Sequence, residues 1–199
     1  MTEDHYFSAD PAAPFTREAF EVEAWGHCFD LVSGSGVFSR GHLDHATAVL
    51  FRELEPPVQG QFLDLGCGYG AIGLAIARAV PLATVTAVDV NERALLLANE
   101  NARAMGLDSR FVAALPAQIP SDMTFDEIWS NPPIRIGKAA LHELLLLWLP
   151  RLRPDGRAIM VVGKFLGADS LQRWLGEQGW PTTRLASVKG FRVLETRRG

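Results

Sequence analysis

Three short segments of the sequence carry residue types that could bind and modify a small molecule. The first is Asp64-Leu65-Gly66-Cys67-Gly68-Tyr69-Gly70, which follows a short apolar run and precedes a helical pattern. Glycines let the backbone turn tightly and approach a ligand. The G-x-G-x-G spacing, with no Gly-Lys-Ser/Thr after it, disfavours a dinucleotide site and a P-loop. The turn therefore suits a cofactor that joins an amino acid to a nucleoside, with Asp64 near its ammonium group, although a purely structural turn would use the same glycines.

Asp89 is the second candidate and ends the apolar run Thr84-Val85-Thr86-Ala87-Val88-Asp89. An acidic residue about 20 residues beyond a Gly-rich turn, at the end of the next strand, is placed to accept hydrogen bonds from ribose hydroxyls. The same carboxylate could cap a helix that begins at Asn91. The two roles are compatible, and the Gly-rich turn makes us favour the ribose contact.

The third segment, Asn131-Pro132-Pro133-Ile134, follows another apolar run. Two prolines end a strand and restrict the backbone. The side-chain carbonyl of Asn131 and the backbone carbonyl of Pro132 could then face a cleft as two acceptors. Accepting both hydrogens of an exocyclic amine orients its nitrogen and frees the lone pair for attack. An Asn-Pro pair is also typical of a plain turn, but its place at a strand end beside the Gly-rich turn favours the chemical role.

These segments lie at the ends of a regular alternation of short apolar runs and helical patterns. Such alternation with short connections predicts an α/β protein with a doubly wound, mostly parallel sheet. The last two strands are too close in sequence for a helical crossover, so we expect an antiparallel hairpin at one edge. Strands are predicted at residues 62–65, 83–89, 111–114, 125–130, 158–162, 183–187 and 191–196, and helices at residues 44–54, 71–80, 91–105, 138–149 and 169–178. Asp44 could cap the first of these helices, and residues 25–43 suggest short strands or a loop with tight turns.

Together, Asp64–Gly70, Asp89 and Asn131–Ile134 resemble the motifs of class I S-adenosylmethionine-dependent methyltransferases that act on amino nitrogens. A more specific resemblance, over roughly residues 29–199, is to small single-domain members of the RsmC-like family, which methylate guanine N(2) of small-subunit ribosomal RNA. The segments that carry it are Gly36-Val37-Phe38-Ser39-Arg40-Gly41 with Asp44, Asn131–Lys138, and Gly190-Phe191-Arg192-Val193-Leu194.

The resemblance implies a Rossmann-like fold with seven strands in the order 3-2-1-4-5-7-6. It also implies methyl transfer from S-adenosylmethionine to an exocyclic amine, with guanine N(2) of RNA as the expected target. A base must leave its stack to reach such a pocket, so the target is expected in a loop or single strand. The residues implied for catalysis are Asn131, Pro132, Pro133 and Ile134; for RNA contact, Phe38, Arg40, Arg135 and Lys138; and for the cofactor, Asp64, Gly66, Cys67, Gly68, Tyr69, Gly70, Asp89, Val90, Ala114 and Asn131.

The sequence departs from this family at three points. Longer members carry a second, degenerate methyltransferase-like domain in front, for which this chain leaves no room. The fourth position of the tetrad is often aromatic, whereas Ile134 offers apolar contact without stacking. The third strand ends in Ala113-Ala114-Leu115, which leaves backbone groups or Gln118 for the adenine amine.

Two other functions remain open from the sequence. A protein glutamine methyltransferase has a similar tetrad, but its fourth residue is normally Tyr rather than Ile134. A non-catalytic RNA-binding or partner module could keep the fold without the activity. The intact acidic, glycine and amide positions argue against such decay; they are Asp64, Gly66, Gly68, Asp89 and Asn131.

Composition and charge fit one enzyme domain. The chain has 199 residues, 48% of them apolar, which suffices for a buried core. A net charge of −4 excludes a polybasic nucleic-acid binder. Residues 101–199 nevertheless carry 14 basic and 9 acidic side chains, so one face can still be basic. We expect residues 1–28 to be an acidic N-terminal leader and residues 29–199 to be the methyltransferase domain.

Few features point to metal or membrane. Cys28 and Cys67 are the only cysteines, too few for a disulfide framework or a zinc site. His42 and His45 could form one corner of a metal site but are more typical of exposed helix-start residues, so no metal is predicted. No apolar run approaches the roughly 20 residues of a membrane helix, and the acidic N-terminus is unlike a signal peptide. A cytoplasmic protein without membrane contact is expected, and the oligomeric state stays open.

Overall fold

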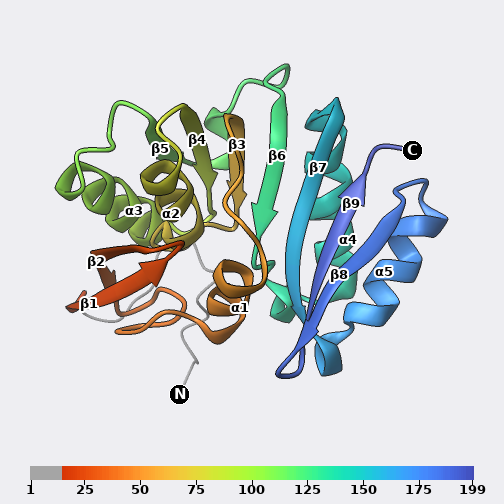
Figure 1. Ribbon diagram of the computed structural model, residues 1–199, viewed down its shortest axis with the longest axis horizontal. Coiled ribbons are helices and arrows are strands. Elements are labelled where there is room, and N and C mark those ends of the chain that lie inside the picture. Colours follow the sequence, from red (N-terminus) through yellow and green to blue (C-terminus); the bar gives the residue numbers. More distant parts are fainter. Residues whose placement is uncertain (1–14) are drawn as a thin grey trace.

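Seven strands form one mixed sheet in the computed structural model, which describes residues 15–199 (Figure 1). The sheet order is β5-β4-β3-β6-β7-β9-β8, and β9 runs antiparallel to both of its neighbours. Counted from β3, this is the expected order 3-2-1-4-5-7-6, which confirms the Rossmann-like α/β class and the antiparallel C-terminal hairpin. The bounds are Gly60–Leu65 (β3), Ala83–Val88 (β4), Phe111–Ala114 (β5), Phe125–Ser130 (β6), Leu152–Gly163 (β7), Thr182–Val188 (β8) and Phe191–Arg197 (β9).

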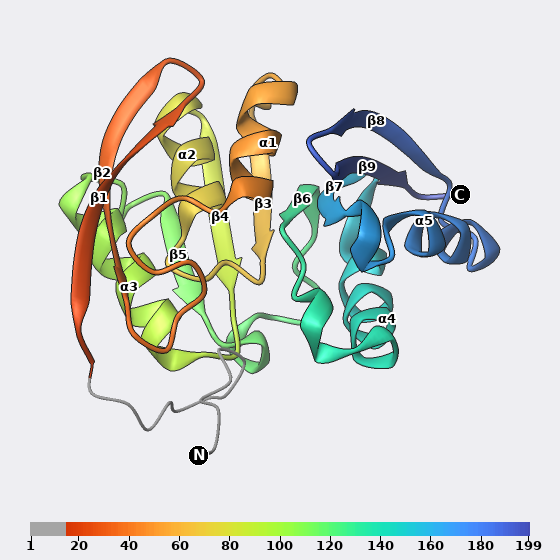
Figure 2. The ribbon, with the colours of Figure 1, turned by 90° about the horizontal axis from the view of Figure 1, so that it is seen from below.

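Helices cover both faces of this sheet (Figure 2). Alternate strand residues face opposite layers: Phe62 and Trp129 are buried on one side of the sheet, Leu63 and Ile128 on the other. The winding direction reverses between β3 and β6, and open α/β sheets bind ligands at such a reversal. One layer holds α1 (His45–Glu53), α2 (Ala71–Ala79) and α3 (Glu92–Ala104), and the other holds α4 (Lys138–Trp148) and α5 (Ala168–Glu177).

The observed bounds lie close to the predicted ones, with one exception. β7 begins at Leu152, well before the expected residue 158. The sequence Pro154-Asp155-Gly156 resembles a turn, but here it lies in a register shift between β6 and β7, where irregular residues are tolerated. Among residues 15–199, no helix is both long enough and apolar enough to cross a membrane.

A two-stranded hairpin precedes the main sheet; its second strand lies within residues 25–43, where short strands or a loop were expected, but its first strand was not predicted. β1 (Arg17–Ala24) pairs antiparallel with β2 (His27–Gly34). The two turn residues, Trp25 and Gly26, have φ of 49° and 75°. Two-residue hairpin turns with positive φ at both positions normally use Asn or Asp before Gly, so Trp at the first position concealed the turn.

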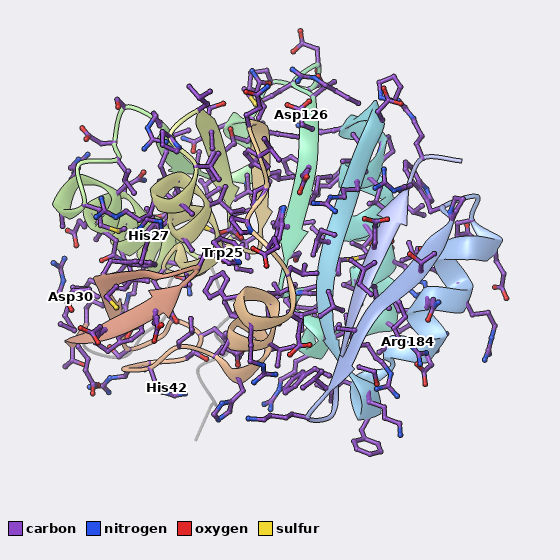
Figure 3. The ribbon with its side chains drawn as sticks, viewed as in Figure 1. Trp25, His27, Asp30, His42, Asp126 and Arg184 are labelled. Atoms are coloured by element: carbon purple, nitrogen blue, oxygen red, sulfur yellow. The ribbon has the colours of Figure 1, made fainter. Side chains whose placement is uncertain are left out.

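This hairpin packs on the rest of the fold. Leu31 is fully buried, and Trp25 lies between the hairpin and the sheet (Figure 3), where its indole N–H donates to the carbonyl of Leu54 at 2.7 Å. The boundary expected between residues 28 and 29 therefore falls within β2. Residues 15–28 share the core of the folded unit, and residues 1–14 of the expected leader lie outside the described residues.

Candidate active site

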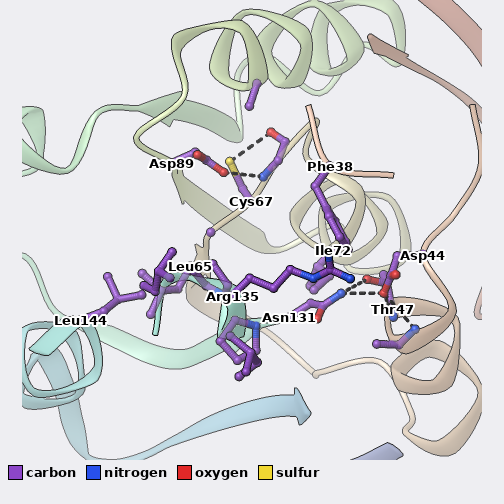
Figure 4. A pocket seen from close by; sticks show the side chains of 18 of the residues that line it. Phe38, Asp44, Thr47, Leu65, Cys67, Ile72, Asp89, Asn131, Arg135 and Leu144 are labelled. Carbon is purple, nitrogen blue, oxygen red and sulfur yellow. Dashed lines mark hydrogen bonds between the residues drawn. The ribbon is translucent and has the colours of Figure 1, made fainter. Parts of the chain in front are cut away.

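A cleft of about 580 Å³ opens at the carboxyl ends of the central strands (Figure 4). It brings together the Gly-rich turn after β3, the end of β4 and the tetrad after β6, as the parallel topology predicts. The loop before α1 and the turn after β7 complete its walls. The expected site residues that line it are Phe38, Gly66, Cys67, Gly68, Tyr69, Asp89, Val90, Asn131, Pro132, Pro133, Ile134 and Arg135.

The Gly-rich turn exposes its backbone to this cleft. Gly68 has a φ of 54°, in the left-handed region, and a Cβ built on it would meet no protein atom within 4 Å. A Cβ on Gly70, by contrast, would lie 3.0 Å from Leu74 Cδ1. The backbone N–H groups of Gly66 and Cys67 both donate to the carbonyl of Val88, at 2.9 and 3.0 Å, which fixes the turn against the end of β4. Gly68 therefore borders open space in the cleft, whereas Gly70 packs against the protein.

Asp89 supports the turn from the neighbouring strand. Its Oδ2 accepts the N–H of Gly68 at 2.9 Å, and its Oδ1 accepts the N–H of Asn91 at 3.0 Å. Burial raises the pKa of Asp89, and the N–H groups of Asn91, Gly68 and Val90 oppose that rise. The cap of α3 is Asn91, not Asp89. Since a carboxylate has about four acceptor positions, Asp89 still has capacity for a ligand hydroxyl.

Asp64 does not line the cleft, in contrast to the expected contact with an ammonium group. It shares a face of β3 with Phe62, so its side chain lies under α2, where Oδ2 accepts the N–H of Gly73 at 2.8 Å. Its Oδ1 is buried without a hydrogen-bond partner among the described residues. Burial, opposed by the Gly73 N–H and reinforced by the charge of Asp89, raises the pKa of Asp64 to about 7. Asp64 thus braces the turn from behind.

The amide of Asn131 is held by the start of α1. Its Nδ2 donates to Asp44 Oδ1 at 2.7 Å and to Thr47 Oγ1 at 3.2 Å (Figure 4). Because the amide has two N–H groups, these two acceptors leave Oδ1 as the atom available to the cleft. Ser130 Oγ donates to the carbonyl of Leu65 at 2.6 Å, which ties the end of β6 to the end of β3.

The two prolines bend the chain sharply after Asn131. The Pro132 carbonyl accepts the N–H of Ile134 at 2.8 Å, and Pro133 has φ −74° and ψ 71°, the values of an inverse γ-turn. One lone pair of the Pro132 carbonyl is therefore used within the turn and one remains. The bend brings Ile134 and Arg135 to the cleft, and the Arg135 side chain extends across it toward Asp44 (Figure 4).

The loop of residues 35–43 forms the opposite wall. Asn91 Nδ2 donates to the carbonyl of Gly36 at 2.6 Å, and the Tyr69 hydroxyl donates to the carbonyl of His42 at 3.2 Å. Tyr69 therefore lines the cleft while its hydroxyl holds the loop, and burial, together with the charge of Asp44, raises its pKa. Phe38 is 43% exposed and faces the cleft.

Three further expected residues lie outside the cleft lining. Arg40 is exposed and pairs with Glu18 Oε2 at 3.4 Å, because the loop turns its side chain toward β1. Lys138 is exposed at the first position of α4. Ala114 is the last residue of β5. The chain turns into the 3₁₀ helix Pro116–Gln118 directly after this strand, so Val90 and Pro116 form the nearby wall of the cleft instead.

Cys67 and His42 each have a polar contact within their own loop. Cys67 is buried, its Sγ donates to the carbonyl of Gly68 at 3.4 Å, and burial and the nearby Asp89 and Asp64 charges raise its pKa. A protonated thiol is a poor nucleophile. His42 Nδ1 lies 2.9 Å from the carbonyl of Arg40. Within residues 15–199, no three His, Cys, Asp or Glu side chains are grouped to hold a metal ion.

Sequence reasoning missed the two residues that orient Asn131. Asp44 was expected as a helix cap, which the structure confirms, and as part of the family resemblance, but not as a partner of Asn131, and Thr47 was not singled out. They are 87 and 84 residues away from Asn131 in the chain. No local pattern could reveal this contact. The one signal in the sequence was Asp44 itself, an acidic helix cap shortly after the segment Gly36–Gly41 that resembles the family.

Comparisons with known proteins agree with this architecture. A family model described as methyltransferase small domain matches residues 29–195. YbxB of Bacillus subtilis, described as uncharacterized, is 33% identical over 198 residues, which cover 98% of either chain. Ribosomal RNA small subunit methyltransferase C of Ectopseudomonas mendocina is 34% identical over 196 residues, which cover 96% of this chain and 57% of that protein.

Two solved structures are also similar. The T. thermophilus 16S rRNA N2 G1207 methyltransferase (RsmC), in complex with AdoMet and guanosine, matches with a TM-score of 0.81 at 27% identity, over 96% of this chain and 53% of that one. A precorrin-6y C5,15-methyltransferase from Geobacter metallireducens matches with a TM-score of 0.65 at 12% identity, over 85% of this chain and 94% of that one, and so supports the fold alone. The chain spans little more than half the length of the RsmC relatives.

Proposed function

The chain belongs to the methyltransferase small domain family, and on that premise we propose that it methylates the 2-amino group of guanine in RNA, with S-adenosylmethionine as the methyl donor. One observation carries the choice of acceptor. The Nδ2 of Asn131 is bound to Asp44 and Thr47, so its Oδ1 is available to the cleft beside the Pro132 carbonyl. Two adjacent acceptors suit a nitrogen that carries two N–H groups.

The cleft suits the cofactor on two grounds. The space beside Gly68 is one that a Cβ would fill, so the backbone there is open to a ligand. The Asp89 carboxylate ends β4 at the position suited to ribose hydroxyls. When bound, S-adenosylmethionine supplies a methyl group already activated on its sulfonium sulfur. We assign Gly66, Gly68, Asp89 and Val90 to holding it.

The residues of this chain act on the reaction mainly by alignment. Asn131 Oδ1 and the remaining lone pair of Pro132 accept the two amine hydrogens, which points the nitrogen lone pair away from the base plane. Phe38 and Ile134 supply apolar contacts for the base, and both line the cleft. Fixed position and preorganised polar groups account for large parts of enzymatic rate enhancement.

RNA is the proposed substrate because relatives over nearly the whole chain are named as ribosomal RNA methyltransferases, and one is solved with guanosine. Those relatives are almost twice as long, so their whole substrate specificity is not carried over. Ribosomal RNA is the first RNA to test, and the cytoplasm, where ribosomes form, is the proposed location.

Transfer of a tritium-labelled methyl group from S-adenosylmethionine to total RNA and to total protein tests the proposal. We expect label in RNA, and N(2)-methylguanosine after digestion to nucleosides and mass spectrometry. Label confined to protein glutamine would favour the alternative amide methyltransferase. Cofactor binding without transfer to RNA or protein would favour a non-catalytic module.

A further inference from the structure

Asp44 lines the cleft and carries a carboxylate oxygen that no described residue uses. Its Oδ1 accepts three hydrogen bonds, from the N–H groups of Ala46 (2.9 Å) and Thr47 (3.2 Å) and from Asn131 Nδ2 (2.7 Å). Its Oδ2 has no hydrogen bond or ion pair with residues 15–199, and Asp44 is a half-buried residue of the cleft wall. Capping of α1 therefore accounts for only one of the two oxygens.

The unused oxygen extends the pair of acceptors already described. The hydrogen bond of 2.7 Å between Asp44 and Asn131 fixes the two side chains next to each other, and Pro132 is the next residue in the chain (Figure 4). Asp44 Oδ2, Asn131 Oδ1 and the Pro132 carbonyl thus form three neighbouring acceptors on one wall of the cleft.

Three adjacent N–H donors distinguish guanine from the other RNA bases. Guanine carries its N1–H beside the two hydrogens of its 2-amino group. Adenine has an unprotonated ring nitrogen on either side of its amine, cytosine has one on one side and a C5–H on the other, and uracil has no amine. A glutamine side chain offers two amide hydrogens but no third donor beside them. A carboxylate that faced an unprotonated ring nitrogen would remain unpaired, which is costly in a closed site.

We infer that Asp44 selects guanine by accepting the N1–H of the base through Oδ2, while Asn131 and Pro132 hold the 2-amino group. This inference rests on the proposed function, since it assigns the residue that reads the base whose amine is methylated. It gives Asp44 two separate roles on two oxygens: one caps α1 and orients Asn131, and the other sets specificity.

The substitution Asp44→Asn separates these roles. Asn is as good a helix cap as Asp, and the three donors that surround Oδ1 keep the amide oxygen on that side. The new NH₂ group then faces the cleft, where it cannot accept the N1–H of guanine. It can donate to the bare N1 of 2-aminopurine, which keeps the 2-amino group. Asp122→Asn, an identical charge change at an exposed residue outside the cleft lining, is the matched control.

Affinities of guanosine and 2-aminopurine riboside, measured with S-adenosylhomocysteine present, test the inference without requiring turnover. We expect the parent and Asp122→Asn to prefer guanosine by at least tenfold. Asp44→Asn should weaken guanosine binding about 10- to 100-fold, the range for a hydrogen bond to a charged group. It should also lose the preference over 2-aminopurine riboside, with melting temperature and S-adenosylhomocysteine affinity unchanged.

The inference is overturned if the parent binds no guanosine or shows no preference for it. It is also overturned if Asp44→Asn keeps the parent's affinity ratio. If the parent shows the expected selectivity yet transfers no methyl group to RNA, the proposed function fails while the role of Asp44 stands. If the parent methylates guanine N(2) but Asp44→Asn keeps the parent's ratio of guanosine to 2-aminopurine riboside affinity, the proposed function stands and the role of Asp44 fails.

Discussion

At the scale of single residues, the orientation of one amide decides the chemistry of the site. An Asn side chain can present either a donor or an acceptor, and the two ends are close in size. Asp44 and Thr47 bind the nitrogen end of Asn131, so the oxygen end is left for the substrate. Under the proposed function, this oxygen accepts a hydrogen bond from the substrate amine.

Asn131→Ala should separate this role from that of a turn residue. If Asn131 Oδ1 acts in the transition state, the single-turnover methylation rate should fall by about 10²–10³, the range for deleting one preorganised polar group. S-adenosylmethionine affinity should stay nearly intact, because Asn131 is assigned to the acceptor. A variant that binds cofactor, melts near the parent temperature and methylates at the parent rate would contradict the assignment.

Asn131→Asp should make activity depend on pH, as a second variant in the same experiment. It places a carboxyl group where Nδ2 lies 2.7 Å from Asp44 Oδ1, and two such close carboxyl groups share a proton, which raises the pKa of the pair. The shared proton restores the donor toward Asp44 at low pH. Activity relative to the parent should therefore fall as pH rises; a constant ratio from pH 5 to 8 would count against this geometry.

At the scale of elements, the turn between β3 and α2 places one glycine, Gly68, on the wall of the cleft. Gly68 and Gly106 both have positive φ, and neither Cβ would meet a protein atom within 4 Å, but only Gly68 lines the cleft. An added methyl group should therefore have a comparable backbone cost at the two positions, but only at residue 68 would it lie in the cleft.

Gly68→Ala and Gly106→Ala should therefore lose similar stability, about 1–2 kcal/mol for a left-handed alanine. Only Gly68→Ala should also lose S-adenosylmethionine affinity, by about tenfold or more, because an extra methyl group in a close-packed contact costs about 1–3 kcal/mol. Calorimetric binding and thermal unfolding of both variants measure the two effects. Equal cofactor affinity in the two variants would place the ligand elsewhere.

Asp64 joins β3 to α2 and should make stability depend on pH. Its pKa rises from 3.8 to about 7 on folding, chiefly through burial. The folded state therefore binds more protons than the unfolded state between these values, so this residue lowers the free energy of unfolding as pH rises from about 4 to 7, with no further loss above 7.

Asp64→Asn should remove that dependence while its side-chain oxygen still accepts the Gly73 N–H. The variant should match the parent near pH 4 and exceed it in melting temperature at pH 8, in the absence of cofactor. Thermal unfolding across pH 4–8 measures the difference. If the melting temperatures of the two proteins changed with pH in parallel, ionisation of Asp64 would not lower the stability of the parent.

At the scale of the whole molecule, the two ends of the sheet differ in whether their basic side chains form ion pairs. Away from the cleft, Arg153 pairs with Asp126 at 2.6 Å, and Arg157 with Glu127 at 3.0 Å. Asp126 lies at the opposite end of β6 from the tetrad (Figure 3). At the cleft end, Arg135 and Lys138 form no ion pair with the described residues. This end is therefore the one suited to phosphates.

Arg135→Ala and Lys138→Ala should each weaken binding to single-stranded RNA. Each should also reduce the slope of log affinity against log salt by about 0.7, since each neutralised phosphate releases counterions. Arg40→Ala is the control, because Arg40 already pairs with Glu18 and lies outside the cleft lining. Unchanged slopes in both cleft variants would place the RNA path on another face.

The order of strands and helices and the convergence of the three motifs could be predicted from the sequence. Periods of apolar residues fix each element locally, and parallel strands place their carboxyl ends at one edge of the sheet. Segments 64–70, 89 and 131–134 therefore had to converge. The same local reasoning failed at the β1–β2 hairpin, whose turn places Trp25 at a positive φ.

The directions of individual side chains, by contrast, depend on how distant elements pack together. Asp64 lies behind the turn because α2 covers its face of β3, although strand alternation with Phe62 was available as a signal. Arg40 leaves the cleft because Glu18 attracts it from the hairpin. Asp44 meets Asn131, 87 residues further along the chain, because α1 packs against β7, the strand next to β6. Such contacts depend on how distant elements pack, and a local pattern records only the neighbours along the chain.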